Sequence, residues 1–169
     1  MTLALVLGIA PDAPGADVAE APRAPRFQVK SVTGETLDLD RLRQQGPVLL
    51  DFWATWCKPC LAALPELEAL HRRFAPRGLT VIGVSVDGPR NFPKVRPFAQ
   101  RLGLSFPIVL DEDGSLQQRF QVRAISTSVL ISADGRIAHV TQGWRPGETA
   151  ALARAISILL PDSTDSSRP

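Results

Sequence analysis

Two cysteines separated by two residues form the part of this sequence that is best suited to chemistry. Cys57 and Cys60 are the only cysteines among the 169 residues. Small secreted scaffolds place cysteines along the whole chain to join distant segments, so this pair does not belong to a structural disulfide framework. The spacing is typical of a redox-active dithiol or of half of a metal site.

The dithiol interpretation gives the two sulfurs different tasks. Cys57 opens an expected helix over residues 57–74, where unpaired N–H groups favour an anion. This position favours the thiolate, which is the nucleophile, and the neighbouring Lys58 adds a positive charge. Cys60 lies one turn later and points the same way, so it can resolve a mixed disulfide. Pro59 suits the first helical turn because its position needs no N–H partner.

The metal interpretation lacks ligands. Zinc takes about four, and beyond the cysteines the sequence offers His71, on the charged side of the same helix, and His139, in a late hairpin. Neither histidine has metal-ligand spacing to the cysteines, and copper chaperones of the Sco kind need three residues between theirs. We therefore expect no metal, no organic cofactor and a surface position for both histidines.

A carboxylate interrupts the apolar run that leads to the dithiol. Residues 47–53 are nearly all apolar, which predicts a fully buried central strand, and Asp51 lies inside this run. A carboxylate in such a place, close to a dithiol, is a candidate proton relay. An inert polar residue at a strand edge is the alternative. Trp53 is expected in the core, whereas Trp56 is expected to border the site.

The remaining patterns alternate between strand and helix. They predict further strands at 27–32, 37–40, 79–86, 107–110, 129–131 and 137–140, and further helices at 95–102, 116–120 and 149–160. This alternation indicates an α/β fold, in which a mostly buried sheet is flanked by helices. We expect one domain over residues 27–160, preceded by a leader and an Ala/Pro linker over 1–26 and followed by a polar tail over 161–169.

Residues 51–60, DFWATWCKPC, resemble the active-site segment of thioredoxin-like proteins, and Pro65 follows the second cysteine as it does in them. Residues 83–87 and 132–137 are similar to later strands of the TlpA/ResA group. These are bacterial thioredoxin-like reductases that are usually exported or membrane-anchored. The resemblance implies a thioredoxin-like fold, with a central mixed sheet flanked by helices and an N-terminal strand extension.

The resemblance also implies an activity. It implies a thiol–disulfide oxidoreductase that exchanges its dithiol with protein disulfides in the reductase direction, with Cys57, Cys60 and Asp51 as catalytic residues. The partners would be protein thiols and disulfides and an upstream redox protein, and the chain is expected to be a monomer. A peroxiredoxin-like peroxidase and a degenerate thioredoxin-like binding module are the alternatives.

Three positions depart from the family pattern. Gly83 stands where thioredoxin has a lysine beside the buried acid, and Ala63 stands where the TlpA/ResA group usually has a glutamate. Ser126 replaces the cis-proline that faces the dithiol in the family. Because a cis bond before a residue other than proline costs about 3–4 kcal/mol, we expect the Ile125–Ser126 bond to be trans. The substrate-binding surface implied by the resemblance consists of Trp56, Lys58, Pro59, Ile125 and Ser126.

Charge and the N-terminus bear on partners and location. The net charge is +2, and no basic stripe is interleaved with aromatic residues, so we expect no nucleic-acid partner. Residues 3–10 form an apolar run that suits a signal peptide but is too short to span a bilayer, and no Lys or Arg precedes it. A signal that starts upstream of Met1, a trimmed N-terminus and a cytosolic leader are all compatible with this.

Together with the resemblance, this N-terminus leads us to expect a periplasmic or otherwise exported protein, with a cytoplasmic one as the alternative. A membrane tether is expected only if the true start lies upstream.

Overall fold

A five-stranded mixed sheet forms the centre of the molecule in a computed structural model that describes residues 21–145 and 147–160. The strand order is β5-β4-β3-β6-β7. β3, β4 and β5 are parallel, whereas β6 is antiparallel to β3 and β7 is antiparallel to β6. The strands are β3 (Val48–Trp53), β4 (Thr80–Ser85), β5 (Ile108–Leu110), β6 (Thr127–Ile131) and β7 (Ile137–Gln142).

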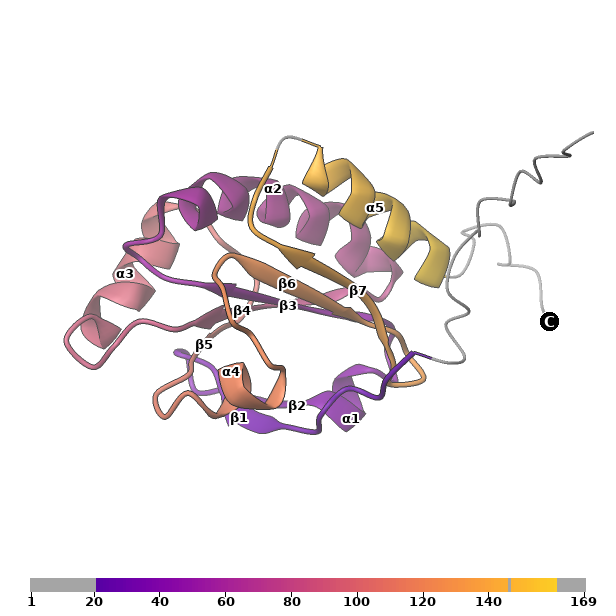
Figure 1. The fold of residues 1–169 in the computed structure, drawn as a ribbon, viewed down its shortest axis with the longest axis horizontal. Helices are drawn as coiled ribbons and strands as arrows, with labels where there is room; N and C mark the ends of the chain where they lie inside the picture. Colours follow the sequence, from indigo (N-terminus) through magenta and orange to yellow (C-terminus); the bar gives the residue numbers. More distant parts are fainter. Residues whose placement is uncertain (1–20, 146, 161–169) are drawn as a thin grey trace, which may run out of the picture.

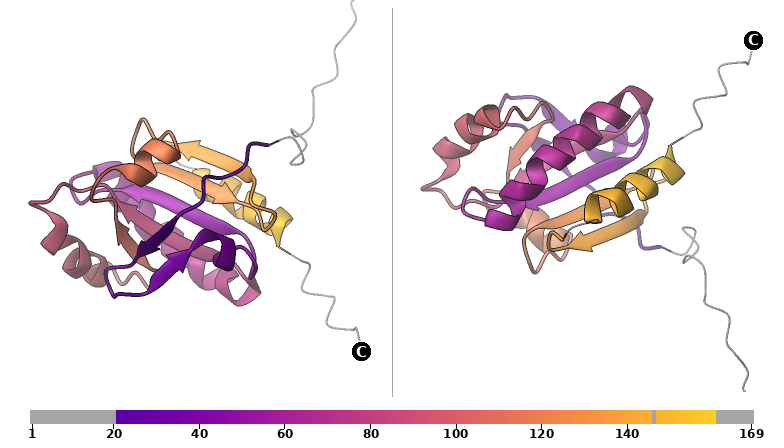
Figure 2. Two further views of the ribbon diagram at one scale, coloured as in Figure 1. Left: turned by 90° about the horizontal axis from the view of Figure 1, so that it is seen from below. Right: turned by 90° about the horizontal axis from the view of Figure 1, so that it is seen from above.

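Both faces of the sheet are covered. The three longer helices lie on one face, and the short elements lie on the other, as the views from the side, below and above show (Figures 1 and 2). The first group is α2 (Lys58–Phe74), α3 (Phe92–Arg101) and α5 (Glu148–Leu159), and the 3-10 turn η2 (Ala75–Arg77) follows α2. The second group is the hairpin β1 (Gln28–Lys30) and β2 (Thr36–Asp38) with α1 (Leu39–Leu42) and α4 (Ser115–Arg119).

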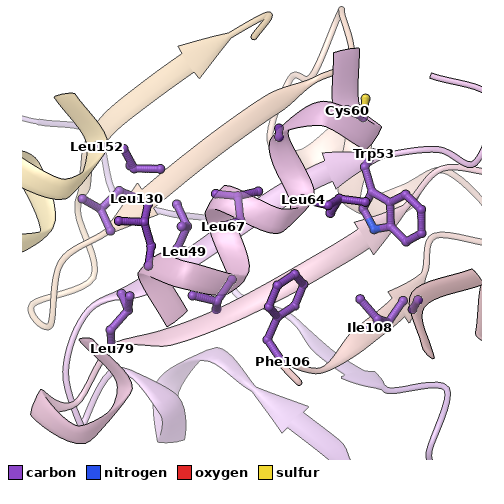
Figure 3. Close-up of a cluster of buried hydrophobic side chains, with 14 of the residues drawn as sticks. Leu49, Trp53, Cys60, Leu64, Leu67, Leu79, Phe106, Ile108, Leu130 and Leu152 are labelled. Atoms are coloured by element: carbon purple, nitrogen blue, oxygen red, sulfur yellow. The ribbon is translucent and has the colours of Figure 1, made fainter. Parts of the chain in front are cut away.

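The central strand β3 divides its side chains between two cores. All six of its residues are buried, and successive side chains of a strand point to opposite faces. Leu49 and Trp53 belong to the core under the long helices (Figure 3). Leu50 and Phe52 belong to the core on the opposite face. Asp51 alternates with Leu50 and Phe52 along the strand. Its side chain therefore points to the same face as Leu49 and Trp53, which is the face that α2 covers.

The patterned segments of the sequence fold as predicted. The central strand, the long helix after the cysteines, the second buried strand and the late hairpin are confirmed, with ends that differ by a few residues. The mixed sheet flanked by helices and preceded by a small strand pair is confirmed as well. Trp53 is fully buried, as expected, whereas Trp56 is 62% exposed.

Two expectations about the N-terminal part need correction. Leu39 does not continue a strand over 37–40 but begins α1, because the Asp38 side chain accepts a hydrogen bond from the Arg41 backbone N–H and caps the helix. Tertiary contacts also start before Phe27. The Ile137 N–H donates to the Pro22 carbonyl at 2.8 Å, so part of the expected linker lies along the late hairpin.

The histidines differ in their surroundings. His71 is half-buried rather than a surface residue, because its ring packs edge-on against Phe106 with 5.9 Å between ring centroids. His139 is also half-buried and contacts the Thr141 hydroxyl at 3.1 Å. Residues 1–20, which are most of the expected leader and linker, and the expected polar tail over 161–169 lie outside the described residues. Among the helices of the described ranges, none combines the length and apolar character that a membrane crossing requires.

Candidate active site

The two cysteines are joined in a disulfide at the start of α2. The S–S distance is 2.06 Å, and the Cα atoms are 5.3 Å apart. Cys57 is the N-cap of the helix, and its Sγ accepts a hydrogen bond from the Cys60 backbone N–H at 3.3 Å. One of the N–H groups that a helix start leaves open thus points at this sulfur. The predicted place of Cys57 at a helix N-terminus is therefore confirmed.

The two cysteines differ in accessibility. Cys57 is 6% exposed, whereas Cys60, in the first turn of α2, is fully buried. Lys58 and Pro59, between them, are both exposed. A partner that approaches from solvent therefore reaches Cys57 first. This order matches the tasks that the sequence predicts for the two sulfurs, and the tasks themselves stay a prediction.

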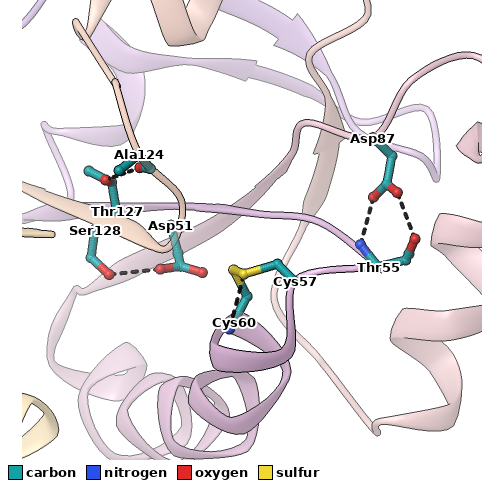
Figure 4. The surroundings of a disulfide bond; sticks show 8 residues. All are labelled: Asp51, Thr55, Cys57, Cys60, Asp87, Ala124, Thr127 and Ser128. Atoms are coloured by element: carbon teal, nitrogen blue, oxygen red, sulfur yellow. Dashed lines mark hydrogen bonds between the residues drawn. A yellow bond between two sulfur atoms is a disulfide. The ribbon is translucent and has the colours of Figure 1, made fainter. Parts of the chain in front are cut away.

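Asp51 lies on the same side of the sheet as the disulfide and is fully buried. Its Oδ1 accepts a hydrogen bond from the Ser128 hydroxyl at 2.7 Å, whereas its Oδ2 has no hydrogen-bond partner. In Figure 4 the carboxylate lies between Ser128 and the two sulfurs, with its second oxygen directed towards them. Burial raises the pKa of Asp51 to about 7, and the Ser128 hydrogen bond opposes part of that rise. A group with such a pKa can take up or release a proton at neutral pH.

The polar neighbour of Asp51 comes from β6 and not from β4. In the sheet register Asp51 stands opposite Gly83 on one side and Ser128 on the other. A Cβ atom on Gly83 would come within 2.7 Å of Ile108 Cδ1 and within 3.1 Å of Trp53 Nε1. The packing therefore has no room for a lysine at this position. Ser128 is the site residue that sequence reasoning missed, and a polar run at residues 126–128, entering a strand that is otherwise apolar, was its signal.

A second carboxylate fixes the loop that carries Cys57. Asp87 is 2% exposed and follows β4. Its Oδ1 accepts a hydrogen bond from the Thr55 hydroxyl at 2.6 Å, and its Oδ2 accepts one from the Thr55 backbone N–H at 2.9 Å (Figure 4). The Ser85 hydroxyl also donates to Oδ2 at 2.9 Å. Asp87 thus holds the backbone two residues before Cys57, a role that sequence reasoning did not find.

The expectation of a trans bond before Ser126 is wrong, because the Ile125–Ser126 peptide bond is cis. Contacts on both sides of this bond fix the backbone, and they outweigh the preference of a non-proline peptide bond for the trans form. The Gly143 N–H donates to the Ser126 carbonyl at 2.6 Å, and the Thr127 hydroxyl donates to the Ala124 carbonyl. Ser126 is 2% exposed, and Ile125 packs against the buried cluster that includes both cysteines.

The predicted substrate-binding residues come together in part. Trp56 and Ile125 line one pocket of about 200 Å³, which also includes Arg123 and Ala124. Lys58 and Pro59 lie on the exposed first turn of α2 and Ser126 is buried, and none of the three lines this pocket. Across residues 21–145 and 147–160, no three His, Cys, Asp or Glu residues are grouped as metal ligands would be.

This fold, with a C-x-x-C disulfide at the start of the helix that follows the central strand, defines a thioredoxin-like thiol–disulfide oxidoreductase. The AhpC/TSA family model matches residues 21–140. The chain therefore belongs to the AhpC/TSA family.

Curated relatives carry the name thiol-disulfide oxidoreductase ResA. The protein from Bacillus subtilis is 30% identical over 146 residues, which are 79% of this chain and 80% of the relative. The protein from Oceanobacillus iheyensis is 33% identical over 124 residues, which are 71% of this chain but only 63% of the relative. The second relative therefore includes a substantial part that this match does not cover.

Solved structures agree with the fold. A putative thiol:disulfide interchange protein DsbE from Chlorobium tepidum is 27% identical, with a TM-score of 0.76 over 83% of this chain and 97% of that one. StoA from Bacillus subtilis is 26% identical, with a TM-score of 0.67 over 79% of this chain and 98% of that one. The thioredoxin-like fold that the resemblance implies is confirmed.

Proposed function

We propose that this chain reduces disulfides in other proteins, with Cys57 as the nucleophile, Cys60 as the resolving thiol and Asp51 as the proton relay. The observation that carries the proposal is the Cys57–Cys60 disulfide at the N-terminus of α2, on the face of the sheet that holds Asp51. The names of the ResA relatives support the same chemistry.

The first step joins the two proteins. In the reduced protein the Cys57 thiolate attacks one sulfur of the substrate disulfide, so that a Cys57–substrate disulfide forms and the substrate S–S bond breaks. The released substrate thiolate takes a proton from solvent. The Cys60 N–H that points at Cys57 Sγ supports the thiolate before this attack.

The second step releases the product. Cys60 gives its proton to the Asp51 carboxylate, and its sulfur attacks Cys57 Sγ. The Cys57–Cys60 disulfide forms, the mixed disulfide breaks, and the substrate leaves as a thiolate that has gained the second electron. The unpaired Oδ2 of Asp51 suits it to accept the proton, because no other group competes for that oxygen among the described residues.

The substrate surface surrounds the exposed edge of the disulfide. Trp56, Lys58 and Pro59 border Cys57 on its own loop and helix, and Ile125 and Ser126 belong to the facing segment before β6. An upstream protein dithiol restores the reduced form by the reverse exchange. We place the protein outside the cytoplasm and treat it as a monomer, with the export supported by the likeness to ResA- and DsbE-type proteins.

Insulin reduction in the presence of dithiothreitol tests the activity. The wild type is expected to accelerate reduction, and Cys57→Ser is expected to abolish the acceleration. A redox potential of about −270 mV, measured against a glutathione buffer, supports the reductase direction, whereas a value of about −120 mV indicates an oxidant. No acceleration, together with rapid consumption of hydrogen peroxide, would replace the proposal with the peroxidase alternative. Binding of proteins without either activity would indicate a binding module.

A further inference from the structure

A pocket of about 200 Å³ opens beside the reactive cysteine. Trp56, which directly precedes Cys57, forms one wall, and the segment before β6 forms the other. The residues that line it are Trp56, Val86, Gln117, Arg123, Ala124 and Ile125. Because Trp56 and Cys57 are neighbours in the chain, a substrate segment that brings a sulfur to Cys57 comes close to this pocket.

The apolar wall that Trp56 gives to the pocket is open to solvent. Trp56 is 62% exposed, although it is the largest side chain at the site. The other large exposed apolar residues, Val140 and Ile158, lie on β7 and α5. An exposed tryptophan beside a reactive sulfur is suited to bind an apolar side chain, since aromatic anchors contribute much of the free energy of protein recognition.

Arg123 gives the same pocket a positive charge. It is exposed, and it forms no hydrogen bond or ion pair with any other described residue. Of the residues that line the pocket, only Arg123 is charged. Asp51 and Asp87, the two buried carboxylates of the site, do not line the pocket.

We propose that this pocket selects protein substrates whose cysteine is flanked by an apolar and an acidic residue, with the apolar side chain on Trp56 and the carboxylate on Arg123. This inference rests on the proposed function and assigns the class of its substrate. A guanidinium binds a carboxylate in a two-pronged arrangement, and Gln117 can pair with the peptide backbone or with an amide. Because the ion pair is exposed, it chiefly affects the encounter and KM rather than the chemical step.

Two synthetic peptides test the selection. Each carries its cysteine in a disulfide with a small neutral thiol, and the sequences Leu-Cys-Asp and Leu-Cys-Lys differ only in the residue after the cysteine, which is acidic in one and basic in the other. An exposed ion pair changes binding by a modest factor, so we expect kcat/KM of the wild type to favour the acidic peptide by about fivefold. Arg123→Glu should reverse this preference. Arg154→Glu, the same change at an exposed position of α5, should leave it intact.

Salt and a neutral substrate separate the possible outcomes. The preference should disappear in 1 M NaCl, where charges are screened within about 3 Å. Reduction of hydroxyethyl disulfide, which is uncharged and small, should be equal in all three proteins. Equal rates on both peptides in the wild type, or an acidic preference that Arg123→Glu retains, would overturn the inference while the proposed function stands. Failure to reduce any of the three substrates would overturn both.

Discussion

The Ser128 hydroxyl donates a hydrogen bond of 2.7 Å to Oδ1 of Asp51, across the antiparallel pair of β6 and β3. The other carboxylate oxygen is buried without a partner. The serine thus fixes the orientation of the carboxylate and leaves one oxygen for proton exchange with the dithiol. Because a hydrogen bond to the charged form favours ionisation, Ser128 also limits the rise in the pKa of Asp51 that burial causes.

Ser128→Ala should therefore move the pH dependence of disulfide reduction. Without the donor, the pKa of Asp51 rises above its present value of about 7, so a smaller fraction is ionised at neutral pH. A hydrogen bond to a charged group contributes about 1.5–3 kcal/mol, which corresponds to a pKa higher by roughly one to two, so we expect turnover at pH 7 to slow by about five- to fiftyfold. The rate should recover as the pH rises to 9. Ser128→Thr, which keeps the hydroxyl, is the control, and an unchanged pH profile in Ser128→Ala would contradict the role.

Asp51→Asn should flatten the pH dependence of stability and slow turnover at neutral and higher pH, where the wild-type carboxylate is ionised. Burial raises the pKa of Asp51 in the folded protein from 3.8 to about 7. Between these pH values the folded state binds more protons than the unfolded state, so the free energy of unfolding falls as the pH rises. The wild type should lose up to about 4 kcal/mol more than the variant between pH 4 and pH 7.

Urea unfolding of the oxidised proteins at pH 4, 5.5, 7 and 8 measures this difference. The other carboxylates are common to both proteins, so the difference between the two curves isolates Asp51. If the two curves of stability against pH are parallel over this range, Asp51 has an ordinary pKa, and this result would contradict its role as the proton relay.

The order of attack can be read from alkylation. In the reduced protein, one equivalent of iodoacetamide at neutral pH should label Cys57, because it is the more accessible sulfur and an N–H of the helix start points at it. Peptide mapping identifies the labelled site. Preferential labelling of Cys60 would reverse the assignment of nucleophile and resolving thiol.

Local pattern was enough to predict the elements that position the dithiol. The apolar run at β3 and the three- and four-residue spacing of leucines in α2 are properties of short windows of sequence. Their junction placed Cys57 at a helix start and Asp51 in a buried strand without any knowledge of the rest of the chain. The resemblance to thioredoxin-like proteins then supplied the topology.

The residues that support the site could not be predicted in the same way. Ser128 and Asp51 are 77 positions apart, and Asp87 and Thr55 are 32 apart, so each pair is formed by the sheet and not by local sequence. The Ile125–Ser126 bond was mispredicted for the same reason, because hydrogen bonds to Gly143 and within the turn fix its backbone. The strand expected over 37–40 rested on local alternation alone, whereas the Asp38 side chain caps a helix that begins at Leu39.

Removal of the Asp87 carboxylate should loosen the loop that precedes Cys57. Asp87→Ala leaves the Thr55 backbone N–H and two hydroxyls without their acceptor. Since an unsatisfied buried polar group costs about 1–3 kcal/mol, we expect the free energy of unfolding to fall by roughly 2–4 kcal/mol. Turnover should fall on small and protein disulfides alike.

Substitutions of Thr55 separate this support from a general loss of stability. Thr55→Val removes only the hydroxyl bond of 2.6 Å, so its effect should be smaller than that of Asp87→Ala, whereas Thr55→Ser should behave like the wild type. The redox potential of the dithiol is the decisive measurement, because a substitution that lowers only the global stability does not alter this potential. An unaltered potential in Asp87→Ala would reduce Asp87 to a structural residue.

Gly83→Ala should destabilise the protein, because the space beside Asp51 is already filled. A Cβ atom there would lie 2.7 Å from Ile108 Cδ1 and 3.1 Å from both Phe106 and Trp53. Overpacking of a core costs about 1–3 kcal/mol, and a lysine at this position should be less well tolerated still.

Gly88→Ala is the matched control, since a Cβ on Gly88 meets nothing within 4 Å. Urea unfolding of both variants at pH 7 measures the effect. Equal stability of the two variants would show that the core next to Asp51 can open, and that the missing lysine has another cause.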